Sequence, residues 1–243
     1  MKKIAILLIV ALFSAIAAFA ETEAYEPVLL EGVVTGITEE GYLVYEETVG
    51  EVMVLVNEET VIEATADISC GDYIYVDYNG QMTRSIPAQI TATVLRMYKV
   101  EGDIVEHMPD DNSVMLNSAE YGEIIVRLPE DWADKEIIDT HLTVYFNGAM
   151  TLSLPAQIGA GLVIPGYSVS GVITESAEDY IVIGEEMSAI QANITAEMLT
   201  EDIVEGTAVR VIYNGQMTRS IPAQVNAISV ETIVPAVEET DAQ

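Results

Sequence analysis

A twelve-residue segment that occurs twice without a single change constrains the fold of this chain more than any other feature. The segment YNGQMTRSIPAQ occupies residues 78–89 and again 213–224, and the variant FNGAMTLSLPAQ occupies 146–157. The asparagines of the three copies are spaced 68 and 67 residues apart. Such a period predicts that one folding unit is used three times.

A second sequence feature recurs once in each predicted unit, at nearly the same spacing. Each unit opens on a glycine that follows a polar residue, in the pairs Glu31-Gly32, Glu101-Gly102 and Ser170-Gly171. Units this small can hold their own core, although they are only marginally stable alone. No Pro/Ser-rich linker separates them, so we expect the units to pack together. The predicted repeats span residues 28–98, 99–167 and 168–235.

Each unit is predicted to contain five short β-strands. Apolar and polar residues alternate with a period of two, as in YIYVDY at 73–78, and Gly, Asn and Asp mark turns between the runs. Segments 131–135 and 195–199, between the third and fourth strands, predict one or two helical turns. The expected strands are 28–35, 41–45, 51–56, 73–78 and 89–97 in the first unit, and 172–174, 180–184, 189–194, 208–213 and 224–230 in the third.

Five strands with a short helix after the third are typical of an OB-like barrel. The sequence therefore predicts an all-β chain built from three tandem five-stranded OB-like barrels. A small β-sandwich and an SH3-like barrel remain alternatives, because the pattern of strands does not fix their connections.

The segments GDYIYVDYNG at 71–80 and SIPAQITA at 85–92 resemble a signature of exported bacterial domains. These are small OB-like β-barrel domains of unknown function. The resemblance covers all three units, most fully the first and third, whereas the middle unit has Asp139-Thr140-His141 where Gly-Asp would stand. It implies a fold and no activity.

The repeated segment is predicted to connect strands four and five, a connection that commonly binds ligands in OB-like barrels. Its Asn-Gly pair suits a tight turn, its proline begins the last strand, and Met82, Met150 and Met217 are expected to plug the barrels. The arginines of the first and third segments are candidates for ligand contact, and an ion pair with an acidic residue of a neighbouring unit is the alternative. The middle unit has Leu152 at this position. The predicted ligand-binding residues are Gln81, Thr83, Arg84, Gln216, Thr218 and Arg219.

The first twenty residues have the pattern of a cleavable signal peptide. Lys2 and Lys3 precede an apolar run, and Ala18-Phe19-Ala20 provides a cleavage site after Ala20. No later stretch is long and apolar enough for a membrane span. We expect a secreted protein that is not an integral membrane protein, with a disordered acidic tail at 236–243.

The net charge of −31 predicts which partners are disfavoured. Polyanions are repelled by such a chain, so the sequence predicts that it does not bind nucleic acid. A cell-wall glycan or an extracellular protein is the expected partner, with weak divalent-cation binding and no cofactor.

No pattern in the sequence predicts a catalytic or metal centre. His107 and His141 lack partners at zinc-ligand spacing, and no nucleophile or phosphate-loop motif occurs. The acidic clusters 110–112 and 130–134, the latter around Trp132, are typical of solvated loop tips. Cys70 is the single cysteine, and it is either a buried thiol or an intermolecular link.

These patterns favour a secreted, non-enzymatic binding module that contacts a cell-envelope or extracellular ligand through the strand 4–5 loop. A structural spacer of the cell envelope is the alternative. A carbohydrate-active hydrolase is a third hypothesis, because two suitably spaced carboxylates suffice for that chemistry.

Overall fold

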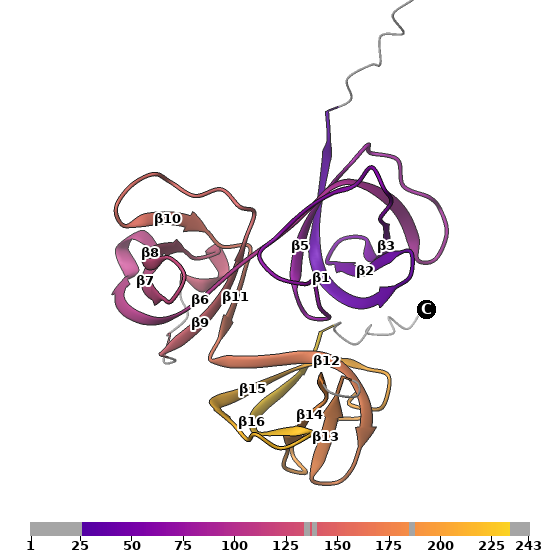
Figure 1. Cartoon of the computed structure of the whole chain (residues 1–243), viewed down its shortest axis with the longest axis vertical. Coiled ribbons are helices and arrows are strands. Elements are labelled where there is room, and N and C mark those ends of the chain that lie inside the picture. Colours follow the sequence, from indigo (N-terminus) through magenta and orange to yellow (C-terminus); the bar gives the residue numbers. More distant parts are fainter. Residues whose placement is uncertain (1–25, 134–136, 138–139, 185–187, 234–243) are drawn as a thin grey trace, which may run out of the picture.

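The computed structural model describes residues 26–133, 137, 140–184 and 188–233. The signal peptide predicted at 1–20 and the tail predicted at 236–243 lie outside these residues. Figure 1 shows three rounded β-units. The described residues form 16 named strands and short 3-10 turns. The described part of the chain contains no α-helix.

The third unit is a closed barrel. Its strands are β12 (Tyr167–Ser176), β13 (Tyr180–Ile183), β14 (Ile190–Asn193), β15 (Ala208–Met217) and β16 (Ala223–Thr232). They follow the order β12-β13-β14-β16-β15, and β15 returns to β12. Only β14 and β16 are parallel. The third strand therefore pairs with the fifth and the first with the fourth, which is the connectivity of an OB barrel.

The first unit has the same connectivity. Its barrel strands are β1 (Val28–Thr38), β2 (Gly41–Glu46), β3 (Gly50–Leu55), β5 (Tyr73–Tyr78) and the first part of β6 (Ala88–Met108). As in the third unit, the third and last strands are parallel. An extra strand, β4 (Val61–Ala64), runs parallel to β6 outside the barrel.

The middle unit divides its fifth strand in two. The second part of β6 is its first strand, followed by β7 (Ser113–Ser118), β8 (Gly122–Arg127) and β9 (His141–Phe146). The fifth strand consists of β10 (Ala156–Gly159), parallel to β8, and β11 (Leu162–Pro165), antiparallel to β9. Two 3-10 turns, η1 (Pro109–Asp111) and η2 (Glu130–Trp132), lie in its loops. The predicted architecture of three OB-like barrels is thus confirmed.

The repeated opening glycine lies where the first strand of each barrel bends over the second. A side chain at Gly32 would overlap the Tyr45 carbonyl oxygen, and side chains at Gly102 and Gly171 would likewise meet atoms of the second strands of their barrels. In each unit the strand pairing shifts register two to three residues later. Glycine and bulge together let one strand curve and pair with both of its neighbours.

One sequence prediction, the helical turns after the third strand, differs in part from the structure. At the corresponding place the first unit has a strand, β4. In the second unit the turn expected at 131–135 is found in part as the 3-10 turn η2, and in the third the segment 195–199 lies in hydrogen-bonded turns over 195–203. Val61 and Ile62 favour an extended chain over a helix in the first of these. Residues 134–136, in the second, lie outside the described part.

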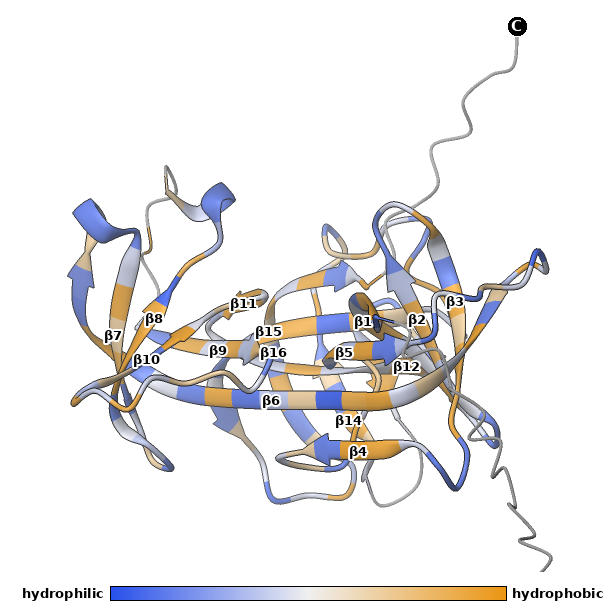
Figure 2. Ribbon diagram, turned by 90° about the horizontal axis from the view of Figure 1, so that it is seen from above, coloured by the Kyte–Doolittle hydropathy of each residue, from blue (hydrophilic) through white to orange (hydrophobic). Residues whose placement is uncertain are grey.

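The predicted boundary between residues 98 and 99 falls inside β6. This 21-residue strand pairs with β5 as far as Arg96 and with β9 from Tyr98 onward. No turn residue intervenes between the two pairings, so the last strand of one barrel continues as the first strand of the next. Figures 1 and 2 show β6 passing from one unit to the other.

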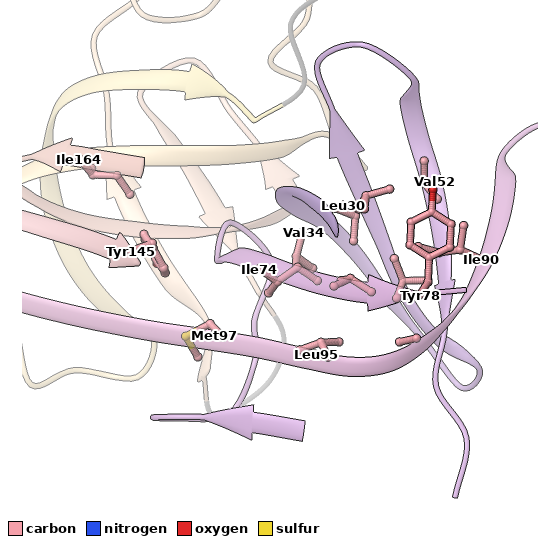
Figure 3. Close-up of a cluster of buried hydrophobic side chains, with 14 of the residues drawn as sticks. Leu30, Val34, Val52, Ile74, Tyr78, Ile90, Leu95, Met97, Tyr145 and Ile164 are labelled. Atoms are coloured by element: carbon pink, nitrogen blue, oxygen red, sulfur yellow. The ribbon is translucent and has the colours of Figure 1, made fainter. Parts of the chain in front are cut away.

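Each barrel encloses its own apolar core, and the first core extends beyond its barrel. Buried side chains of the first unit, among them Ile74 and Met97, form one cluster with Tyr145 and Ile164 of the second and Ile212 of the third. Figure 3 shows Met97, Tyr145 and Ile164 at one end of this cluster, with Tyr145 between the other two in the view. Apolar side chains from all three units therefore provide part of the expected packing between units.

Polar contacts complete this junction between the barrels. The Tyr145 hydroxyl donates to the buried Asp72 carboxylate at 2.7 Å, and Arg210 Nη2 donates to the Gly71 carbonyl at 3.0 Å. The imidazole of His141 stacks on the Tyr167 ring, with centroids 4.0 Å apart and planes 10° apart. These contacts join the first unit to both others and the second unit to the third.

Cys70 lies at the same junction. Its thiol is half-buried and donates to the Thr35 carbonyl at 3.4 Å. Its pKa is raised to about 11, mainly by burial and in part by the nearby Asp72 carboxylate, against the opposing effect of Arg210. Cys70 is therefore a protonated thiol at neutral pH in the described structure.

We predict that Gly71→Ala weakens the docking of the first barrel onto the third. Gly71 has a φ of +91°, and an added Cβ would overlap the Ser170 side chain. Gly50→Ala is a matched control, because Gly50 has a φ of +85° and no atom within 4 Å of an added Cβ. Both variants should lose about 1–2 kcal/mol from left-handed backbone strain. In small-angle scattering only Gly71→Ala should enlarge the molecule, and equal profiles would contradict this prediction.

The raised pKa of Cys70 predicts slow alkylation. The folded chain should react with iodoacetamide at a rate that increases about tenfold per pH unit from pH 8 to 10, because the thiolate fraction rises in that proportion below the pKa. In denaturant the rate should level off near the ordinary pKa of about 8.5. Because the folded pKa is the higher one, this group's contribution to stability is complete below pH 8.5 and is lost as the pH rises towards 11.

Candidate ligand-binding loops

The repeated segment forms the loop between the fourth and fifth strands of every barrel. The first two loops span residues 79–87 and 147–155, and in the third barrel β15 extends to Met217, which leaves 218–222. The last strand begins directly after the proline, as predicted. The peptide bonds preceding Pro87, Pro155 and Pro222 are all cis.

Hydrogen bonds within the loop hold its shape. In the first unit Thr83 Oγ1 accepts from the Gln89 backbone N–H at 2.8 Å, while the Thr83 N–H donates to the Gln89 carbonyl at 3.0 Å. The Ser85 hydroxyl lies 2.7 Å from Thr83 Oγ1 and donates to the Pro87 carbonyl at 2.8 Å. The loop thus satisfies its own polar groups.

The other two loops repeat this network. Thr151 and Ser153, and likewise Thr218 and Ser220, hold their hydroxyl oxygens 2.7 Å apart. The asparagine of each Asn-Gly pair also accepts a backbone N–H two residues later, at 3.0–3.1 Å. Three copies of one geometry show that most of the repeated segment builds the loop itself.

The structure divides the six predicted ligand residues into two groups. The hydroxyls of Thr83 and Thr218 bond within their loops. The side chains of Gln81, Arg84, Gln216 and Arg219 belong to exposed residues. Among the described residues neither Arg84 nor Arg219 forms an ion pair, so the alternative of an inter-unit salt bridge is not observed. Arg210 makes the inter-unit contact instead.

Sequence reasoning missed the apolar tips of these loops. Ile86 is 100% exposed, Leu154 is 98% exposed and Ile221, at the same position of the third loop, is 71% exposed. The middle loop adds Leu152, which is 104% exposed and stands in the place of the arginines. The sequence does contain a signal for these tips: each otherwise polar loop has a large apolar residue directly before its proline.

Shallow pockets lie beside two of the loops. One of about 310 Å³ is lined by Gln81, Met82 and Thr83, and one of about 370 Å³ by Met150, Thr151 and Arg127. Met82 and Met150 also pack against their cores, which confirms the predicted plugs. Met217 is 42% exposed, so the prediction is wrong for the third barrel, where β15 carries this residue outward.

The histidines and acidic residues considered as metal ligands form no metal centre among the described residues. No cluster of three His, Cys, Asp or Glu side chains with metal-binding geometry occurs within the described ranges. Trp132 packs against the core of the middle unit and, with His107, lines a small pocket of about 80 Å³. The described residues also include no helix long and apolar enough to cross a membrane.

Comparisons with known proteins give only distant likenesses. No family model matches the chain, and no curated protein matches it. One similar solved structure is described as a multidomain protein with nucleic acid binding domains from Streptococcus pneumoniae TIGR4. It is 14% identical with a TM-score of 0.22, over 84% of this chain and 73% of that one. A second, described as Drosophila Unr CSD456, is 13% identical with a TM-score of 0.20, over 86% of this chain and 98% of that one.

These comparisons correct the prediction that the chain does not bind nucleic acid. The matches include a protein described by its nucleic acid binding domains, so the exclusion drawn from charge is contradicted. The physical reason is that net charge belongs to the whole chain, whereas a nucleic acid is bound by a local surface. The exclusion is therefore withdrawn, and likenesses this distant assign no nucleic acid ligand to this chain.

We predict that Thr83→Val loosens the first loop and that Thr83→Ser does not. Valine keeps the shape of threonine but removes the oxygen that accepts from the Gln89 N–H, at a cost of about 1 kcal/mol. Amide hydrogen exchange at Gln89 should accelerate several-fold in Thr83→Val and stay unchanged in Thr83→Ser. Equal protection in both variants would show that the hydroxyl does not hold the loop.

Proposed function

We propose that the chain is a non-enzymatic binding module that contacts an extracellular or cell-envelope ligand through its three strand 4–5 loops. The observation that carries this proposal is the fully exposed apolar side chain at the tip of the first two loops, repeated in the third at 71% exposure. A side chain such as Ile86 gains on the order of 2 kcal/mol when it is buried, and none of the described residues buries it.

The loops are also preorganised for contact. Their internal hydrogen bonds fix each tip without a ligand, so little conformational entropy is lost on binding. In the first and third loops an exposed arginine stands two residues before the apolar tip, and its guanidinium can pair with a carboxylate or phosphate. The middle loop, with Leu152 and Leu154, offers a purely apolar contact.

Three tips on one chain suggest multivalent binding. Even weak contacts become strong when several engage one partner together, because the second and third contacts form at high effective concentration. Our proposal includes the export expected from residues 1–20 and membership among exported bacterial proteins of repeated small OB-like barrels. It includes no catalytic step.

A structural spacer is the second candidate function. It is supported by the shared strand β6 and by the close contacts at the junction, which make one body of three barrels. A spacer, however, needs stable barrels and no exposed apolar tips. The tips therefore favour binding over spacing alone.

The tips can be tested by sedimentation of the mature chain, residues 21–243, with an isolated bacterial envelope preparation. The wild type should bind saturably. The triple variant Ile86→Ser, Leu154→Ser and Ile221→Ser should bind at least tenfold more weakly, since each lost contact also lowers the avidity of the others. Arg84→Ala with Arg219→Ala should weaken binding as well.

A control variant removes other exposed apolar residues, which lie outside the loops. Ile37, Val105 and Ile228 are 57%, 52% and 61% exposed, one in each barrel. Their triple serine variant should bind like the wild type. Absence of saturable binding to the envelope preparation and to proteins of the culture fluid would overturn the binding proposal and leave the spacer.

A further inference from the structure

A cleft of about 600 Å³ lies where the three barrels meet, away from the loop tips. The first unit contributes Glu31 and Tyr73 from β1 and β5, with Glu46 and Glu47 from the end of β2. The third unit contributes Arg210 from β15, and the second closes the cleft with the backbone at Gly161. Its volume is in the range of sites for small molecules.

The walls of the cleft are held in place before any ligand binds. A side chain at Gly161 would overlap the Tyr75 hydroxyl, and one at Gly71 would overlap Ser170. Tyr73 and Tyr75 pack edge to face, with centroids 5.3 Å apart. Barrels in such close contact leave the cleft little freedom to collapse.

Arg210 is a cation without a carboxylate in contact. Its Nη2 donates to the Gly71 carbonyl, its Nε is buried without a partner, and it forms no ion pair among the described residues. Two carboxylates act on Arg210 through space without an ion pair: Glu231, which faces it across the strand pairing, and Asp72. The Asp72 carboxylate instead accepts from the Tyr145 hydroxyl and from the Ser69 N–H. The charge of the guanidinium is therefore not neutralised by a direct contact.

Carboxylates stand on the opposite wall. Strand pairing sets Glu31 across from Tyr75 and next to Tyr73. Burial raises the pKa of the Tyr73 hydroxyl, and the charges of Glu31, Glu47 and Glu46 raise it further, in accord with three carboxylates close to this ring. One wall of the cleft is thus anionic and aromatic, and the other carries a single guanidinium.

We propose that this cleft binds a small zwitterion, a free amino acid or a dipeptide. Its carboxylate would lie at Arg210, and its ammonium group among Glu31, Glu46 and Glu47. A simple anion would be repelled by three carboxylates, and a simple cation would leave the charge of Arg210 unmatched. A zwitterion alone complements both walls, and tyrosine rings favour an ammonium group through cation–π attraction.

Isothermal titration calorimetry of residues 21–243 tests this site, with L-leucine, L-lysine and alanyl-alanine as probes. At least one probe should bind with a Kd of about 1 mM or tighter. Its N-acetyl derivative and its carboxamide should each bind at least tenfold more weakly, because each lacks one charge. No binding by any probe at concentrations of about 10 mM, ten times that Kd, or equal binding of the blocked forms, would overturn the proposal.

Variants distinguish the cleft from the loops. Arg210→Gln and the double variant Glu31→Gln, Glu47→Gln should each weaken binding of the probe at least tenfold. If Arg210→Gln disturbs the junction between the barrels, the double variant still tests the cleft, because Glu31 and Glu47 are exposed. Arg84→Gln should change nothing, and a loss of probe binding in that variant would move the site to the loop and overturn the cleft.

Discussion

The hydrogen bond from Tyr145 to the buried Asp72 carboxylate is the interaction on which the arrangement of the barrels depends. A buried carboxylate is costly unless its oxygens are satisfied, and Asp72 meets this condition with Tyr145 from the second barrel and the Ser69 N–H from its own. The backbone carbonyl of Asp72 also accepts from an N–H of the first strand of its barrel. Thr140 and Thr207 make this backbone hydrogen bond in the other two barrels, but they carry no carboxylate. The repeats share a fold, and only the first supplies this docking group.

The sequence predicted the barrels well because a period, a turn pair and an alternating pattern are local features. Strand β5 was predicted to the residue, and the opening glycines are explained by the bend of each first strand. The continuity of β6 was not predictable in this way. Nothing local distinguishes a strand that ends at residue 97 from one that continues into a second barrel, since the difference lies in its pairing with β9.

The candidate site was predicted only in part, for a related reason. The repeated segment was correctly placed on the strand 4–5 loop, yet repetition alone does not separate residues that build a loop from residues that the loop presents. Thr83 builds it, whereas Ile86 is presented. Arg210 drew no attention in the sequence, because its place in an alternating strand is that of any outward residue. Its importance arises from barrels that approach it from far along the chain.

Because the barrels are docked rigidly, the spacing between their exposed loop tips is fixed. Strand β6 begins just after the first loop and continues into the second barrel, while the His141–Tyr167 stack and the hydrogen bond from Arg210 to Gly71 fix the third. Tips on flexible tethers would adapt to many spacings at an entropic cost, but tips on one rigid body favour partners that match their spacing. If the loops bind as we propose, selectivity therefore depends on the junction between barrels as much as on the loops themselves, and substitutions far from any tip should alter avidity without altering a single contact.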